Sequence, residues 1–310
     1  MRRCAERFLR ILERAVTAAL YPFYLLSERL GRGRLAVLMY HQVGRPLEGV
    51  RGGDECVSPH TFETQIRTLL HAGYRATSLR SLLGGRPGAS SFIGRQFVVT
   101  FDDGYRGQFE NALPVLRRYK IPATFFLVAG AVGTGRPLSH LCSDGEERHD
   151  GVPEEWRSLG WDQARRLAGE GMTIGSHSLS HRSLGRLEAA EIEDELRRSK
   201  AILERGAGAR VELFAYPFGS GAYGDFDRGI QGILRRAGYL GACTTVVGRN
   251  DAGIDPYALR RIPMEEGDGP FRVRCKLVGA YDWVGPAKSL WQKLVPRRDR
   301  VDRPLLLGVE

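Results

Sequence analysis

Residues 96–104 read Gln-Phe-Val-Val-Thr-Phe-Asp-Asp-Gly, and this stretch decides the fold. The apolar run at 96–101 is short and continuous, which is typical of a strand buried on both faces in a parallel sheet. Asp102 and Asp103 follow its carboxyl end, where adjacent carboxylates repel each other unless a cation lies nearby. Gly104 permits a sharp turn, so both carboxylates can face one cavity. By itself the stretch is equally consistent with a helix N-cap and a turn.

The chain on either side alternates between apolar strands and helices. We expect further strands at 35–40, 123–128, 172–174, 213–216 and 240–245. We expect helices near 59–71, 107–119, 162–168, 188–204 and 229–237. About seven such units, with no glycine-rich phosphate loop after the first strand, favour a barrel over an open nucleotide-binding sheet. The expected fold class is α/β, a distorted (β/α)7-type barrel forming a single catalytic domain, with a polar loop at 136–155 over its mouth.

The first 33 residues differ from the rest, with apolar residues at helical spacing and arginines between them. The uncharged run from Ala15 to Leu26 is shorter than the roughly 20 residues that span a bilayer, and Pro22 interrupts it. A basic amphipathic helix on a membrane surface and a helix packed on the domain itself both remain open. We therefore divide the chain into three parts, namely a basic amphipathic segment at 1–33, a catalytic domain at 34–275 and a basic tail at 276–310.

The net charge of +10 calls for an anionic partner or a membrane surface. No zinc-finger spacing, RNA-recognition motif or dense basic block is present in the middle of the chain, so nucleic acid is not expected as a partner. The excess is visible at both ends, at Arg2, Arg3, Arg7, Arg10 and Arg14 and at Lys293, Arg297, Arg298, Arg300 and Arg303. Anionic lipid headgroups account for basic ends most simply. The 5 scattered cysteines lack CxxC spacing and indicate reduced thiols.

Residues 175–181 read Gly-Ser-His-Ser-Leu-Ser-His and again follow a short strand. His177 and His181 lie four positions apart, so that both imidazoles can project from one helical turn toward one metal. Such a pair alone is usually a surface coincidence, but together with Asp103 it predicts a divalent-metal site. Two imidazoles and one carboxylate leave positions open for water and substrate. The set suits zinc first, and also cobalt, nickel or iron. His41, directly after the first strand, is expected at the same mouth.

These motifs resemble those of the polysaccharide deacetylase family, the NodB-homology carbohydrate esterases (carbohydrate esterase family 4), over most of residues 35–265. The resemblance implies that Asp102 is the general base and that Asp103, His177 and His181 bind the metal. The implied reaction is hydrolysis of N-acetyl groups on the amino sugars of a polysaccharide. Rival hypotheses are a deformylase or peptidoglycan deacetylase on the same scaffold, and a catalytically inactive carbohydrate-binding module.

Residues 214–219 read Phe-Ala-Tyr-Pro-Phe-Gly and resemble the family motif that shapes one wall of the groove. We expect substrate contacts from Tyr105, Trp161, Tyr216, Pro217 and Phe218. By the same resemblance, the backbone N–H of Tyr105 stabilises the oxyanion.

The chain departs from the family pattern at two places. Ala215 stands where the family commonly has an arginine that supports the base, and Arg261 is a candidate replacement. No histidine follows His181, although the family's acid histidine usually comes late. Residues 39–43, Met-Tyr-His-Gln-Val, instead resemble the branch that deacetylates poly-β-1,6-N-acetylglucosamine, in which the motif order is permuted. The resemblance therefore makes His41 the general acid. The cellular location stays open, because three features point to different places. The cysteines favour a reducing compartment, and residues 1–33 favour a membrane surface. The family resemblance favours the cell envelope.

Overall fold

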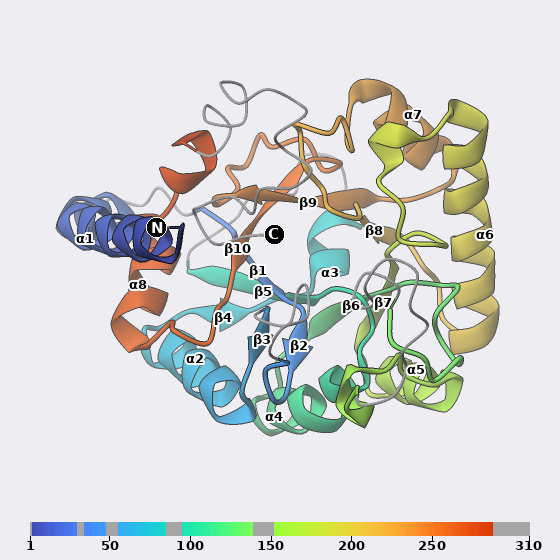
Figure 1. The fold of residues 1–310 in the computed structure, drawn as a ribbon, viewed down its shortest axis with the longest axis horizontal. Coiled ribbons are helices and arrows are strands. Elements are labelled where there is room, and N and C mark those ends of the chain that lie inside the picture. Colours follow the sequence, from blue (N-terminus) through green and yellow to red (C-terminus); the bar gives the residue numbers. More distant parts are fainter. Residues whose placement is uncertain (1, 30–33, 48–54, 85–94, 139–151, 288–310) are drawn as a thin grey trace.

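The structure is a computed structural model that describes residues 2–29, 34–47, 55–84, 95–138 and 152–287. Its centre is a closed barrel of parallel strands (Figure 1). The strands are β1 (Ala36–Tyr40), β5 (Gln96–Phe101), β6 (Ala123–Leu127), β7 (Thr173–Ser176), β8 (Leu213–Ala215), β9 (Gly241–Val247) and β10 (Leu259–Pro263). The expected (β/α)7 barrel is confirmed, and β10 is a strand that the apolar pattern did not reveal.

Barrel closure depends on β1, which lies between the last strand and β5. Leu38 of β1 is in register with Ile262 of β10, while Ala36 is in register with Phe97 of β5. The remaining order around the barrel is β10-β9-β8-β7-β6-β5. A short strand, β4 (Arg75–Ala76), pairs with the start of β5. All these pairings are parallel, so the residues that follow the strands meet at one mouth.

Helices surround the barrel and cover its outer side (Figure 1). They are α2 (Pro59–His71), α3 (Leu79–Leu83), α4 (Leu113–Tyr119), α5 (Trp161–Gly169), α6 (Ala189–Ala207), α7 (Arg228–Arg236) and α8 (Pro270–Val278). Their ends follow from local chemistry. Ser58 caps α2 by accepting from the Thr61 N–H, and Asp227 caps α7 by accepting from the Ile230 N–H. Gly208 takes the left-handed conformation, which ends α6.

The mouth carries shorter elements. A two-stranded parallel pair, β2 (Gln42–Val43) and β3 (Cys56–Val57), follows β1. A π-turn, η1 (Gln108–Ala112), precedes α4, and the short 3-10 helices η3 (Glu154–Trp156) and η4 (Leu184–Arg186) lie in the connecting loops. Of the long loop expected at 136–155, residues 139–151 lie outside the described part of the chain.

The N-terminal segment forms one long helix, α1 (Arg2–Arg29), which lies against α8. None of the helices in the described ranges is long and apolar enough to cross a bilayer. Beyond α8, Tyr281 and Val284 are buried. The domain division expected at residue 275 therefore falls inside α8, and the basic tail residues from 288 onward lie outside the described part.

Candidate active site

The two carboxylates leave the barrel at the carboxyl end of β5. The Asp102 N–H donates to the Tyr40 carbonyl at 3.0 Å, which continues the ladder between β1 and β5 for one more residue. Asp103 then takes a φ of 76°, which turns it away from the strand direction. The two side chains are 1% and 4% exposed, so both carboxylates are withdrawn from water and need charged partners.

The two histidines lie in a loop after β7 rather than on the helical turn that their spacing suggested. The His177 N–H donates to the Leu127 carbonyl of β6 at 2.8 Å, and the His181 N–H donates to the Ser178 hydroxyl at 2.9 Å. Ser178 and His181 have positive φ values of 65° and 58°. This backbone brings both rings to the mouth, with centroids 4.9 Å apart.

A buried carboxylate on α6 holds this loop. Glu195 accepts hydrogen bonds from the Leu179 N–H at 2.9 Å and from the Ser180 N–H at 3.0 Å, and it also accepts from the Ser180 hydroxyl. In the sequence Glu195 looks like one more charge on a solvated helix, and no motif marks it. Its contacts identify it as the residue that fixes the loop carrying both histidines.

Asp103, His177 and His181 form a candidate metal site, because their donor atoms lie within 4.8 Å of one another. The His177 Nδ1 lies 2.8 Å from the Ala215 carbonyl, which accepts only from a protonated nitrogen. In neutral His177 the Nε2 lone pair therefore faces Asp103 Oδ1 at 3.5 Å, and His181 Nε2 lies 3.3 Å from the same oxygen. Burial lowers the pKa of His177 to about 4, which keeps that ring neutral. The Nε2 lone pair and the Asp103 carboxylate are both electron-rich and repel each other unless a cation lies between them. The three side chains therefore fit a divalent metal.

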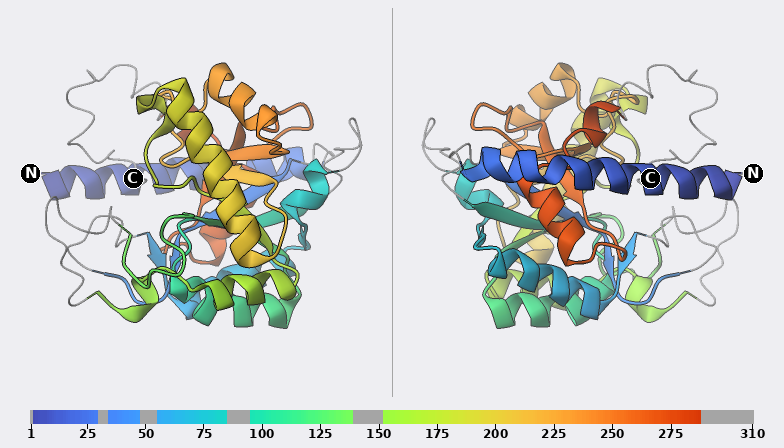
Figure 2. Two further views of the ribbon diagram at one scale, coloured as in Figure 1. Left: turned by 90° about the vertical axis from the view of Figure 1, so that its right-hand side faces the viewer. Right: turned by 90° about the vertical axis from the view of Figure 1, so that its left-hand side faces the viewer.

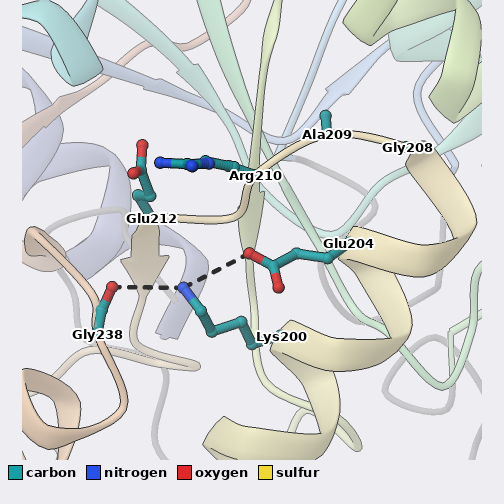
Figure 3. A pocket seen from close by; sticks show the side chains of 7 residues that line it. All are labelled: Lys200, Glu204, Gly208, Ala209, Arg210, Glu212 and Gly238. Carbon is teal, nitrogen blue, oxygen red and sulfur yellow. Dashed lines mark hydrogen bonds and ion pairs between the residues drawn. The ribbon is translucent and has the colours of Figure 1, made fainter.

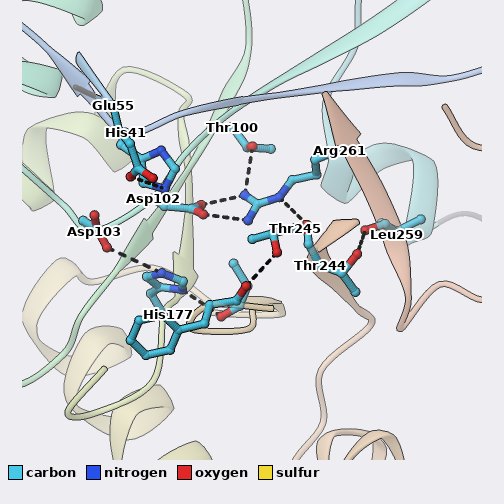
Figure 4. Close-up of polar contacts among 12 residues, drawn as sticks. His41, Glu55, Thr100, Asp102, Asp103, His177, Thr244, Thr245, Leu259 and Arg261 are labelled. Atoms are coloured by element: carbon cyan, nitrogen blue, oxygen red, sulfur yellow. Dashed lines mark hydrogen bonds and ion pairs between the residues drawn. The ribbon is translucent and has the colours of Figure 1, made fainter. Parts of the chain in front are cut away.

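Arg261 of β10 binds Asp102 through two parallel hydrogen bonds (Figure 4). Its guanidinium nitrogens lie 2.7 and 2.6 Å from the two carboxylate oxygens, and its Nε donates to the Thr244 carbonyl at 2.8 Å. Burial raises the pKa of Asp102, but the charge and hydrogen bonds of Arg261 and the nearby histidines together lower it further, so the pKa lies below the ordinary carboxyl value. The arginine is thus present in space although Ala215 stands at its usual place in the sequence.

His41 lies on the other side of Asp102, directly after β1 (Figure 4). Its Nε2 is 3.4 Å from a carboxylate oxygen of Glu55, a residue that no sequence motif indicated. Gln108 of η1 donates to the His41 carbonyl at 2.8 Å and also to the Asp102 carbonyl. Burial lowers the pKa of His41, whereas the carboxylates of Glu55, Asp103 and Asp102 raise it, and the net direction is upward.

The five expected substrate contacts separate into two groups. Phe218 is 42% exposed, and its ring centroid lies 5.1 Å from that of His181. Tyr105 is buried against Trp156, with ring centroids 5.3 Å apart, and its hydroxyl is hydrogen-bonded to Asp103. Both therefore adjoin the candidate metal ligands, and Phe218 presents a surface to solvent beside them.

The other three expected contacts are packed into the structure. Tyr216 is fully buried and donates to the Tyr257 carbonyl at 2.9 Å, and Pro217 is buried beside it. The Trp161 ring lies so close to Gly133 and Gly206 that a Cβ at either glycine would stand within 2.6 Å of it. Tyr216 thus lies within the core and Trp161 is half-buried, and their contact with a substrate stays a prediction.

Backbone strain concentrates around the same mouth. The described residues other than glycine that have positive φ are Asp103, Lys120, Ser178, His181 and Phe218. All except Lys120, which ends α4, belong to the mouth. Such conformations cost free energy and persist where the surroundings enforce them, as active sites often do.

A polar hollow lies at the opposite end of the barrel, where α6 ends and β8 begins (Figure 3). Three of its charged side chains have polar partners. Lys200 donates to the Gly238 carbonyl at 3.3 Å and lies 3.7 Å from Glu204, while Glu212 pairs with Arg80 at 2.6 Å. We assign no chemistry to this hollow.

The chain is similar to several known proteins. The family model described as polysaccharide deacetylase matches residues 91–242. The YxkH protein of Bacillus subtilis (strain 168) is 23% identical over 239 residues, which cover 76% of this chain and 72% of that one. The poly-beta-1,6-N-acetyl-D-glucosamine N-deacetylase of Staphylococcus aureus (strain MRSA252) is 29% identical over 167 residues, 53% of each chain, so this chain matches about half of that relative's length.

Among solved structures, IcaB from Ammonifex degensii superposes with a TM-score of 0.62 at 24% identity, covering 79% of this chain and 97% of that one. This likeness shows the same fold. Over residues 91–242, which carry Asp102, Asp103, His177 and His181, the chain is thus similar to the polysaccharide deacetylase family.

Proposed function

We propose that this protein is a metal-dependent N-deacetylase that removes acetyl groups from the amino sugars of a polysaccharide. One observation carries the proposal. The Asp103, His177 and His181 donor set lies beside a carboxylate, Asp102, that Arg261 keeps ionised. An ionised base next to a metal site is what hydrolysis of an unactivated amide requires. Zinc is the metal that this donor set suits first.

The residues divide the reaction between them. Asp103, His177 and His181 would hold a divalent ion, which would polarise the acetyl carbonyl and lower the pKa of bound water. Asp102 accepts the proton of the attacking water, and the backbone N–H of Tyr105 donates to the developing oxyanion, a role taken from the family resemblance. His41, protonated, donates to the departing amine nitrogen, which is otherwise a poor leaving group. Phe218 offers an apolar face to the sugar ring.

The proposed substrate is poly-β-1,6-N-acetylglucosamine or a similar N-acetylated polymer. Two observations support it. The Staphylococcus aureus relative carries that activity in its name. His41 also comes before the aspartate pair in the chain and stands beside Asp102 in space, as the permuted branch requires. The position of His41 lies outside the residues 91–242 that match the family model.

The decisive experiment measures acetate release from β-1,6- and β-1,4-linked N-acetylglucosamine oligomers, with and without chelator. Asp102→Asn and His41→Ala are compared with wild type, and Arg197→Gln on the exposed side of α6 serves as the control. We expect chelator-sensitive release, preferentially from the β-1,6 oligomer, that both site variants lower by a factor of about 100 or more and the control leaves intact.

Other outcomes lead elsewhere. If acetate release persists after His41→Ala, the protein is still a deacetylase but His41 is not its general acid. Release only from formylated sugars or peptidoglycan fragments assigns a different substrate on the same scaffold. Oligomer binding without any release, in metal-loaded protein, rejects the deacetylase and identifies a carbohydrate-binding module.

A further inference from the structure

Helix α1 has two faces of different character. Toward the barrel, Glu13 and Thr17 are buried. Four apolar side chains on this side pack against a cluster formed by Cys275, Val278 and Ala280, and they are Leu20, Tyr21, Tyr24 and Leu25. These contacts explain why α1 packs on α8. They involve one side of the helix and leave the other side uncovered.

The outward face of α1 is apolar and uncovered. Its large side chains are Ile11, Leu12, Phe23 and Leu26, which are 58%, 47%, 72% and 60% exposed. Smaller exposed residues lie between them, namely Ala15, Ala18, Ala19 and Pro22. Between residues 11 and 26 the one exposed charge is Arg14.

Exposed apolar side chains are otherwise scarce in the described part of the chain. Two further large ones occur there: Phe218 at the site, and Phe271 of α8, which is 54% exposed. The Phe271 ring lies 5.3 Å from that of Tyr21, so it extends the surface of α1 onto α8. A continuous apolar stripe of this kind marks an interaction surface.

The charge of α1 points to the partner. The helix contains six arginines against three glutamates, and one of those glutamates, Glu13, is already paired with Arg272 at 3.1 Å. The whole chain carries +10. A second copy would present the same positive helix and be repelled, whereas anionic lipid headgroups attract it. We propose that the outward face of α1, with Phe271 beside it, lies in the interface of an anionic lipid membrane.

The barrel is tied to α1 by buried ion pairs. Arg272 bridges Glu13 of α1 and Asp268, with its Nε 2.6 Å from an Asp268 oxygen, and Lys276 lies 2.6 Å from the other oxygen. Membrane contact through α1 therefore fixes the position of the catalytic domain as well. The helix acts as part of the folded surface rather than as a tether.

The position of α1 determines how the mouth is presented. The helix lies at the outer edge of the molecule (Figure 1) and runs along the barrel, with its amino end on the side where β2 and β3 mark the mouth (Figure 2). With α1 lying flat in the interface, the mouth opens sideways along the membrane surface. This arrangement suits a polymer that passes over the membrane.

The test is co-sedimentation of the full chain with vesicles of phosphatidylcholine, with and without phosphatidylglycerol. Phe23→Gln combined with Leu26→Gln removes two apolar contacts from the outward face. Arg197→Gln combined with Arg198→Gln removes two exposed charges from α6 and serves as the control. We expect wild type and the control to bind anionic vesicles, binding to weaken with salt, and the apolar double variant to bind about tenfold or more weakly.

Three results would overturn the proposal. The apolar variant could bind vesicles as well as wild type, or the α6 control could lose as much vesicle binding as the apolar variant. Alternatively, wild type could be a dimer in solution and the apolar variant a monomer. Acetate release from soluble oligomers is measured in parallel. Release that is unchanged in the apolar variant shows an intact domain, so the membrane proposal and the proposed enzymatic function fail or succeed separately.

Discussion

Arg261 and Asp102 form a fully buried ion pair between strands that close the barrel. Replacing Arg261 with Met leaves a buried carboxylate without its partner, so we expect the free energy of unfolding to fall by about 3–5 kcal/mol. Arg261→Lys keeps a charge but cannot make two parallel hydrogen bonds. Its free energy of unfolding should therefore lie between those of Arg261→Met and wild type. Urea unfolding measures both variants. Adding Asp102→Asn to Arg261→Met should restore part of the loss, and a further loss instead would show that the pair is not what stabilises this position.

Glu55 adjusts the proton affinity of His41. Its negative charge raises the pKa of His41, and the proposed mechanism needs that ring protonated. Glu55→Gln lowers the His41 pKa, so the alkaline limb of kcat/KM moves to lower pH while activity at acidic pH is kept. The pH profile on a soluble oligomer measures this shift. An alkaline limb that stays in place in Glu55→Gln would assign it to another group.

At the level of residues, the sequence pointed to side chains that share a motif and named Arg261 as a candidate partner of the base, but it did not reveal Glu55 or Glu195. Asp102 with Asp103, and His177 with His181, carry their own local pattern. Arg261 lies 159 positions from Asp102, and the two meet because β1 draws β10 and β5 together. Glu55 and Glu195 show no pattern at all, since a single carboxylate among polar neighbours looks like a solvated surface. Aromatic identity alone does not separate a groove wall from a core residue, so the substrate contacts expected from Tyr216 and Trp161 stay predictions.

The loop after β7 is the element that presents both histidines, and Glu195 of α6 holds it. Glu195→Gln keeps the shape of the side chain but removes the charge that binds two backbone N–H groups. We expect metal affinity to fall by about 10–100-fold, because the groups that orient metal ligands contribute on that scale. Competition with a chelating dye measures the change. Glu193→Gln, an exposed position on the same helix, is the matched control. Equal losses in both variants would mean that net charge, not loop support, sets the affinity.

Helices and strands with a regular apolar pattern in the sequence were predicted well. Segments whose backbone has positive φ values, or whose apolar pattern is interrupted, were not. The apolar strands and the long charged helix at 188–204 correspond to β1, β5, β6 and α6. The HSLSH segment has the spacing of a helical turn, yet its left-handed residues and the hydrogen bonds to Glu195 make it a loop. The strand β10 was missed because Arg260 and Arg261 interrupt its apolar pattern, although the second of them is buried by its pairing with Asp102.

For the whole molecule, metal binding is expected to raise stability, because the donor set exists only in the folded chain. At a metal concentration 100 times the dissociation constant, the gain is about 2.7 kcal/mol. Thermal unfolding with and without zinc measures it. Asp103→Asn weakens the donor set and should abolish most of the shift, whereas Glu193→Gln should preserve it. A shift of equal size in Asp103→Asn would place the zinc elsewhere on the protein.

The closure of the barrel by β1 also bears on how the protein is made. During synthesis His41 leaves the ribosome early, and Arg261, which pairs with Asp102, emerges more than 200 residues later. The first strand cannot complete its pairing until the last one, β10, has been translated. A nascent chain that ends between residue 181 and β10 thus contains Asp103, His177 and His181 but neither a closed barrel nor the arginine that pairs with Asp102. Barrel closure and the pairing of Asp102 with Arg261 are therefore completed in the same step, when β10 joins β1.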